Sequence, residues 1–209
     1  FPTVKFYKWG VRDPKEYAGD WHEEPLVRWV AHEFGLGPAA PPPSPPLVSA
    51  ADAQAYMNAM LDASPPHEHG FVLVPELCDV GFSMNLDAIV DEQTGEWARQ
   101  RAVRDQVWIQ YGFADRDEHG RGLNCTAIVD PSGRVHETYT KVHPFSHGLE
   151  SKYYAGGDRL VLVEVGDLLV CPMICYDLRF PELWRLARRA GAQAFAIGAS
   201  WPAVRHEHW

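Results

Sequence analysis

Cys175 is the residue whose type and setting point most directly to chemistry. It follows the apolar run Leu168 to Ile174, which predicts a strand, and it precedes a helix that begins at Pro181. A strand, a tight turn and a helix would hold the thiol at the carboxyl end of a sheet, where open α/β sheets place active sites. Backbone N–H groups at such a turn favour a thiolate and can stabilise a developing oxyanion. The alternative is a buried structural cysteine, because cysteine is among the residue types most often found in cores.

Two charged residues also stand at the ends of predicted strands. Glu76 comes two residues after the apolar run 71–74, and Lys141 is the last residue of the predicted strand 134–141. A thiol that attacks an amide needs a base to accept its proton, and the resulting oxyanion needs a cation or N–H donors. Glu76, Lys141 and Cys175 supply these groups without a metal. For each charged residue the alternative is a solvated side chain at a strand end.

The segments around these three residues resemble the nitrilase (carbon–nitrogen hydrolase) superfamily, whose members use a Glu–Lys–Cys triad in this chain order. They are Val74-Pro-Glu-Leu77, Thr140-Lys-Val-His-Pro-Phe145 and Ile174-Cys-Tyr-Asp-Leu-Arg-Phe-Pro-Glu182. The spacings, 65 residues from Glu76 to Lys141 and 34 from Lys141 to Cys175, suit the family. Further segments look most like the omega-amidase branch, namely Gly81-Phe-Ser-Met-Asn85, Tyr154-Ala-Gly-Gly157 and Ala199-Ser-Trp-Pro202 with His208-Trp209.

The resemblance implies a role for each matching residue. Glu76 would be the general base that deprotonates Cys175 and later activates water. Cys175 would attack the amide carbonyl, release ammonia and leave a thioester. Lys141 and the backbone N–H of Tyr176 would hold the oxyanion. Glu150 matches the family's second glutamate, which orients the substrate and Lys141.

Substrate-binding residues are also implied by the resemblance. Arg179 stands four residues after Cys175, and in some relatives this position binds a substrate carboxylate, because a guanidinium can contact both of its oxygens. A structural salt bridge from Arg179 to Glu182 or Asp177 is the alternative. Three further residues are expected to line the pocket, with core packing as their alternative: Phe82, Met84 and Trp201.

Histidine-rich segments do not predict a metal site. His67-Glu-His69 and His206-Glu-His208 contain ligand types without the i, i+4 spacing of a helical site. His143 and His147 have that spacing, but Pro144 opposes a helix there. We therefore expect neither a metal nor a cofactor.

The elements that must position these residues alternate between α and β. Helices are expected from a cap at Ser49 or Asp52 to Leu61, and over residues 94–104 and 181–190. Strands are expected over residues 71–74, 107–113, 124–129, 134–141, 160–165, 168–174 and 194–199. Hairpin turns are predicted at Asp130-Pro-Ser-Gly133 and Gly166-Asp167. The continuous apolar run 71–74 is typical of a strand buried on both faces, and the resemblance implies a four-layer α-β-β-α sandwich.

The first 46 residues differ from the rest of the chain. They are rich in Trp, Tyr, Pro and charge, with a helix candidate near residues 23–34 and six prolines between residues 37 and 46. Such a run indicates a linker or an extended polyproline arm. We predict an unassigned N-terminal segment at 1–46 and a carbon–nitrogen hydrolase-like domain at 47–209. The family's first strand would fall on the proline run and relatives continue past Trp209, so this domain is expected to be incomplete at both ends.

Composition limits the remaining possibilities. The chain has 209 residues, of which 46% are hydrophobic and 22% charged, as in globular proteins. A net charge of −9 argues against nucleic acid or an anionic membrane as a partner, and no apolar run approaches the length of a membrane span. Four cysteines are too few for a disulfide scaffold and fit a reducing compartment, so a cytoplasmic protein is expected.

The expected function is hydrolysis of a small linear amide with release of ammonia. The omega-amide of a dicarboxylic or 2-oxo dicarboxylic acid, such as 2-oxoglutaramate, is the substrate that the branch resemblance implies. A nitrile or N-carbamoyl hydrolase on the same triad and a non-catalytic truncated fragment are the alternatives. The expected partners are a small-molecule amide and, if the full-length fold is present, a second copy in a homodimer.

Overall fold

The computed structural model describes residues 50–79, 81, 83–89, 93–146 and 149–200. In chain order the elements are α2 (Ala50–Ala63), β1 (Phe71–Leu73), α3 (Leu86–Ile89), α4 (Gln93–Asp105), β2 (Trp108–Arg116), β3 (Gly122–Val129), β4 (Val135–Thr140), α5 (Glu150–Tyr153), β5 (Tyr154–Ala155), β6 (Val163–Val165), β7 (Leu168–Ile174), the 3-10 helix η1 (Cys175–Arg179), α6 (Pro181–Arg189) and β8 (Ala194–Gly198). The helix expected at 23–34, the proline-rich linker and the domain boundary near residue 46 lie outside the described residues and stay predictions.

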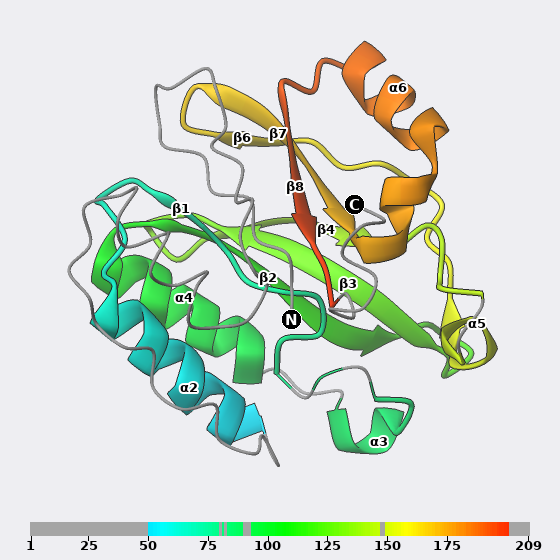
Figure 1. Cartoon of the computed structure of the whole chain (residues 1–209), viewed down its shortest axis with the longest axis horizontal. Helices are drawn as coiled ribbons and strands as arrows, with labels where there is room; N and C mark the ends of the chain where they lie inside the picture. Colours follow the sequence, from blue (N-terminus) through cyan, green and yellow to red (C-terminus); the bar gives the residue numbers. More distant parts are fainter. Residues whose placement is uncertain (1–49, 80, 82, 90–92, 147–148, 201–209) are drawn as a thin grey trace, which may run out of the picture.

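Two sheets face each other, and helices cover both outer faces (Figure 1). The first sheet has the strand order β1-β2-β3-β4, with β5 beside β3, and the second has the order β6-β7-β8. Helices α2 and α4 pack on the outer face of the first sheet, and α6 packs on the outer face of the second. This arrangement confirms the expected four-layer α-β-β-α sandwich.

Alternation along the strands assigns side chains to the two faces of each sheet. In β7, Val170 and Ile174 pack between the sheets, whereas Cys171 and Met173 pack against α6. Because both faces are covered by apolar layers, β7 reads as a continuous apolar run in the sequence.

The predicted helices and strands are found with ends shifted by a few residues. One expectation about burial is wrong: the strand at 71–74 was expected to be buried on both faces, but Phe71, Val72 and Leu73 are only half-buried. The reason is position, since among the described strands β1 pairs only with β2 and lies at the edge of its sheet. The short elements α3, α5, β5 and η1 were not predicted.

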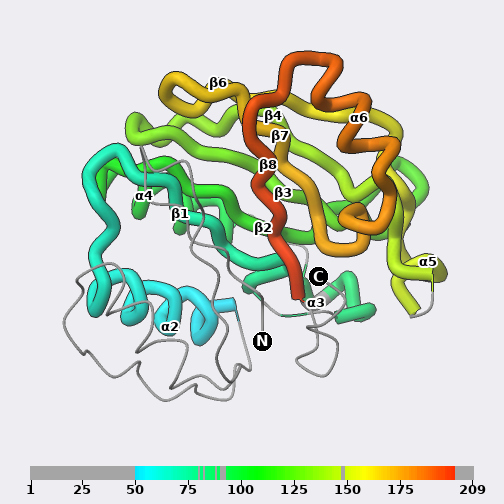
Figure 2. The backbone as a smooth tube through the Cα atoms, turned by 45° about the horizontal axis from the view of Figure 1, so that its top comes forward, coloured from blue at the N-terminus to red at the C-terminus, as the bar shows by residue number. Residues whose placement is uncertain are grey.

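The second sheet lies against the first at β8 (Figure 2). Gln110 of β2 donates a hydrogen bond from its side chain to the backbone carbonyl of Ala196 in β8, at 3.1 Å. Parallel pairing of β7 with β8 places Ile174 opposite Gly198. The residues that follow these two strands therefore emerge side by side, next to the first sheet.

Each helix among the described residues is too short or too polar to span a lipid bilayer.

Candidate active site

The turn that carries Cys175 has the predicted strand–turn–helix form. Cys175 directly follows β7, begins η1, and has φ of 42°, in the left-handed region. Residues other than glycine rarely adopt this conformation, and where they do, they cluster at functional sites. After η1, helix α6 begins with Pro181 in its first turn, where a missing N–H costs no helical hydrogen bond.

A buried carboxylate, Asp177, fixes this turn to the first sheet. Its oxygens accept hydrogen bonds from the Tyr139 hydroxyl at 2.7 Å, from the His143 backbone N–H at 2.9 Å and from His143 Nδ1 at 3.1 Å. The His143 ring also stacks on Phe180, with ring centroids 3.4 Å apart. The turn with Cys175 and the loop after β4 are thereby held as one unit.

Glu76 reaches the site because the backbone after β1 lies close to β2. A Cβ atom on Gly112 would come within 2.7 Å of both the Pro75 carbonyl oxygen and the Leu77 nitrogen. Leu77 has φ of 45°, which turns the chain sharply just after Glu76. The Ser200 backbone N–H, beyond β8, donates to Glu76 Oε2 at 3.0 Å. Glu76 is thus held by both sheets.

Lys141 lies between two carboxylates. Its Nζ is 2.7 Å from Glu76 Oε1, and 3.1 and 2.9 Å from the two carboxylate oxygens of Glu150. Glu76 is 3% exposed, and Lys141 and Glu150 are fully buried. The alternative of solvated charges at strand ends is therefore wrong for Glu76 and Lys141. The Phe145 backbone N–H donates to Glu150 Oε2 at 2.5 Å and fixes that side chain as well.

One side chain in this cluster, Asn124 of β3, was not predicted from the sequence. Its Nδ2 lies 2.8 Å from Glu76 Oε1 and 2.8 Å from Glu150 Oε1. A signal was present, because Asn124 begins the first strand of the predicted hairpin and Lys141 ends the second. Their backbones do pair, with Lys141 N–H donating to the Asn124 carbonyl at 2.8 Å.

The electrostatics of the cluster suit a thiol and a neighbouring base. Burial raises the pKa of Cys175, the negative charge of Glu76 raises it further, and Lys141 partly offsets these effects. Burial alone would lower the pKa of Lys141, but Glu76 and Glu150 raise it above its ordinary value. At neutral pH the site therefore holds a protonated thiol on Cys175 and an ammonium group on Lys141.

The expected binding residues have varied surroundings. Tyr176 is half-buried, and its ring makes edge-on contacts with Phe145 and Phe180 at centroid distances of 5.0 and 5.4 Å. Arg179 is exposed at the end of η1. Met84 is half-buried and packs on a small apolar cluster, made of Leu77, Ile89, Ala114 and Tyr154. Phe82 and Trp201 lie outside the described residues.

Potential metal ligands do not gather in the described part of the chain, where no three His, Cys, Asp or Glu side chains could hold an ion together. The segment His206-Glu-His208 lies outside that part.

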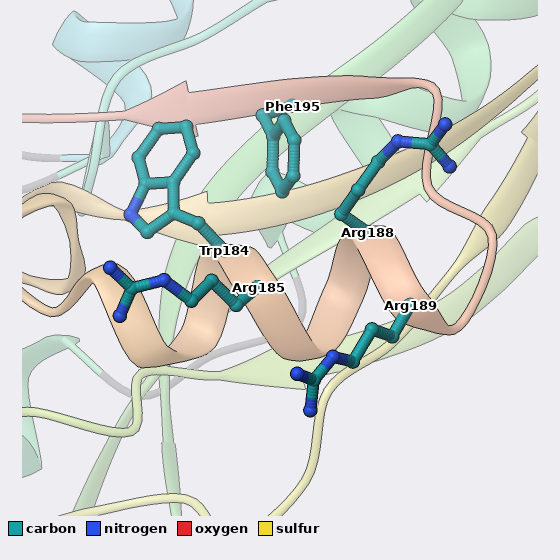
Figure 3. A pocket seen from close by; sticks show the side chains of 5 residues that line it. All are labelled: Trp184, Arg185, Arg188, Arg189 and Phe195. Carbon is teal, nitrogen blue, oxygen red and sulfur yellow. The ribbon is translucent and has the colours of Figure 1, made fainter.

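A separate surface hollow lies over α6 and β8 (Figure 3). Two aromatic and three basic side chains line it, namely Trp184, Phe195, Arg185, Arg188 and Arg189. The rings of Trp184 and Phe195 pack together, with centroids 4.7 Å apart. None of the residues expected to act in catalysis lines this hollow.

Comparison with known proteins identifies the family of the chain. A family model described as carbon-nitrogen hydrolase matches residues 48–209. A 2-oxoglutaramate amidase of Bacillus subtilis is 33% identical over 147 residues, which are 68% of this chain and 57% of that protein. An omega-amidase, YafV, of Yersinia enterocolitica is 30% identical over 163 residues, which are 76% of this chain and 61% of that protein. The chain thus spans about six-tenths of the length of these curated relatives.

Solved structures show the same fold. A CN-hydrolase superfamily protein of Xanthomonas campestris, with an arsenic adduct in its active site, matches with a TM-score of 0.69 and 29% identity, over 77% of this chain and 63% of that one. An amidase from Nesterenkonia sp. AN1 in complex with acrylamide matches with a TM-score of 0.60 over 76% of this chain and 61% of that one. Its sequence identity of 20% supports the fold alone.

Proposed function

The chain belongs to the carbon–nitrogen hydrolase family of the nitrilase superfamily, and from this premise we propose that it is an amidase whose nucleophile is Cys175. The observation that carries the proposal is the buried contact of Lys141 with Glu76 and Glu150, beside the turn that carries Cys175. Buried charges are costly unless they are paired, and this cluster keeps a base and a cation next to a thiol.

In the first step, Cys175 attacks the amide carbonyl. The thiol proton passes to the Glu76 carboxylate as the carbon–sulfur bond forms, and the carbonyl π electrons move to oxygen. The Lys141 ammonium and the Tyr176 backbone N–H stabilise this oxyanion, an effect that is strong because the cluster is shielded from water.

In the second step, the tetrahedral intermediate collapses. Glu76 returns the proton to the amide nitrogen, the carbon–nitrogen bond breaks, and ammonia departs. The acyl group stays on Cys175 as a thioester.

In the third step, water gives a proton to Glu76 and attacks the thioester carbonyl. The carbon–sulfur bond breaks, the acid product leaves, and the thiolate of Cys175 recovers its proton from Glu76. Glu150 orients Lys141 and the substrate throughout.

The proposed substrate is the omega-amide of a dicarboxylic or 2-oxo dicarboxylic acid. Support comes from relatives named 2-oxoglutaramate amidase and omega-amidase, at 33% and 30% identity. Arg179 would bind the distal carboxylate with its guanidinium. Tyr176 would flank the substrate, and the pocket would be lined by Phe82, Met84 and Trp201. A homodimer in the cytoplasm stays a prediction.

Replacement of the nucleophile tests the proposal. Cys175→Ala and Cys175→Ser should lower ammonia release from 2-oxoglutaramate by more than about 10³-fold, since the thioester cannot form. The matched control is Cys125→Ser. Cys125 lies within a strand and contacts the Thr140 hydroxyl at 3.5 Å, so this variant should keep near-normal activity. Undiminished ammonia release from the Cys175 variants would contradict the mechanism.

A panel of amide, nitrile and N-carbamoyl substrates separates the alternatives. Preferential turnover of a nitrile or carbamoyl compound would assign the same triad to one of those reactions. If the folded wild-type chain turned over none of the three classes, the non-catalytic fragment would be favoured.

A further inference from the structure

Asn124 bridges the two site carboxylates, as Lys141 does, but through a neutral amide group. Asn124 is 1% exposed, and its Nδ2 donates to Glu76 Oε1 and to Glu150 Oε1, both at 2.8 Å. A carboxylate accepts hydrogen bonds and an amide nitrogen has two N–H donors, so both donors are used. The orientation of the amide follows from these partners.

The other end of the amide supports this orientation. Asn124 Oδ1 is buried and has no hydrogen-bond partner among the described residues. A buried unsatisfied acceptor is costly, and the opposite rotamer would place that oxygen against two carboxylates. The contacts of Nδ2 with Glu76 and Glu150 therefore decide how Asn124 lies.

The cluster contains two carboxylates and a single ammonium group. Two carboxylates that share a buried site tend to hold a proton between them, and a protonated Glu76 could not accept the proton of Cys175. The Oε1 atoms of Glu76 and Glu150 that face Asn124 are instead occupied by its N–H donors. Hydrogen bonds to the charged form of a carboxylate favour that form.

We infer that Asn124 is a positioning residue that keeps Glu76 in its ionised, proton-accepting form by donating to Glu76 and Glu150 together. The inference rests on the proposed function, since it assigns Asn124 to the same site. An amide suits this task because it donates twice without titrating.

Other titratable groups face the same cluster. Lys141 and Cys175 belong to the proposed mechanism. Tyr154 of β5 has its pKa raised to about 12, chiefly by burial and the nearby carboxylates, so it stays neutral. Asp79 accepts a hydrogen bond from Thr94 at 2.9 Å.

Two substitutions test the inference. Asn124→Leu keeps the number and branching of the side-chain heavy atoms and removes both donors, and Asn124→Asp keeps the shape and adds a third acid. The rate of Cys175 alkylation by iodoacetamide is followed by mass spectrometry of the Cys175 peptide. It measures, at each pH, whether Glu76 can accept the proton of Cys175, and it needs no substrate. The pH profile of kcat/KM for a substrate that is turned over gives the second measurement.

We expect both variants to move the acid limb of both profiles to higher pH by about one unit, with Asn124→Asp shifted at least as far as Asn124→Leu. At a pH above the limb, the rates should recover to within a few-fold of wild type. The matched control is Thr126→Val, which removes a buried hydrogen bond on the same strand, from Thr126 to the Tyr111 carbonyl at 2.9 Å, and should leave the limb in place.

Equal rate loss at every pH with an unmoved limb would assign Asn124 a structural role only and overturn the inference, as would unchanged profiles. If Asn124→Leu fails to fold, the isosteric Asn124→Asp decides. A shifted alkylation limb in a chain that hydrolyses no amide would uphold the role of Asn124 while the proposed function fails.

Discussion

At the scale of single residues, the surroundings of Cys175, the proposed nucleophile, keep its thiol protonated at neutral pH. Cys175 has a left-handed backbone, is 8% exposed, and has its pKa raised by burial and by Glu76. A thiol in this state needs a base at the moment of attack. The proposed base, Glu76, and the cation, Lys141, are buried within hydrogen-bond distance of one another.

The raised pKa predicts how Cys175 titrates. A thiol paired with a free cation forms thiolate at neutral pH, whereas Cys175 should give no thiolate absorbance below about pH 9. The measurement is the ultraviolet difference titration of wild type against Cys175→Ser. The background should be flat, because burial raises the pKa of Cys78 and Cys171 to about 12 and that of Cys125 to about 11. A Cys175 signal at pH 7 would contradict a resting thiol.

At the scale of elements, close backbone contacts bring the proposed catalytic side chains together. The loop after β1 lies on β2 because Gly112 has no side chain. The turn after β7 is bound to the loop after β4 through Asp177. Each loop emerges from a strand whose register is set by its sheet, so the positions of Glu76, Lys141 and Cys175 follow from strand pairing.

The glycine in β2 offers a test at this scale. Gly112→Ala would push the backbone around Glu76 away, and should lower the rate of ammonia release by more than about tenfold and the free energy of unfolding by about 1 to 3 kcal/mol. Ammonia release and urea unfolding measure these two effects.

The control for Gly112→Ala is Gly95→Ala in α4, where the nearest contact of the added carbon is the Tyr111 hydroxyl at 3.3 Å. Alanine favours a helix by up to about 1 kcal/mol over glycine, so Gly95→Ala should be neutral or stabilising and keep activity. Normal activity in Gly112→Ala would show that Glu76 does not depend on this contact.

At the scale of the whole molecule, the site depends on the packing of one sheet on the other. Glu76, Asn124 and Lys141 belong to the first sheet and its loops, whereas Cys175 follows a strand of the second. The apolar residues between the sheets, Ile128 and Ile174 among them, therefore hold Cys175, the proposed nucleophile, in place against Glu76, its proposed base.

Loss of apolar volume between the sheets should reveal this dependence. Ile128→Ala should lower the free energy of unfolding by about 2 to 5 kcal/mol, because Ile128 is fully buried. Urea unfolding measures the free energy of unfolding. When the temperature is raised, ammonia release by Ile128→Ala should be lost at a lower temperature than in wild type. Leu186→Ala, at a side chain 53% exposed on α6, serves as the control, with a change of less than about 0.5 kcal/mol. Equal stabilities of the two variants would contradict the assigned core.

Local patterns in the sequence were sufficient to predict most elements, whereas the layered fold and Glu150 were expected from the resemblance to a family. Apolar runs, hairpin turns and the segments around Glu76, Lys141 and Cys175 are properties of neighbouring residues, so they can be read along the chain. The burial of Glu76 and Lys141, and the half-buried state of β1, could not be predicted in this way. They depend on what packs against each strand.

Asn124 shows most clearly what only the tertiary structure decided. Its partners Glu76 and Glu150 lie 48 and 26 residues away in the chain, and the predicted hairpin pairs Asn124 with Lys141 but does not reveal these two contacts. Gly112 and Asp177 are similar, because their effects reach across strands to Glu76 and to His143. The sequence by itself determined which chemical groups are available and in what order. Their distances, burial and ionisation arise when strand pairing and sheet packing bring remote segments together, since hydrogen bonds and charges act through space.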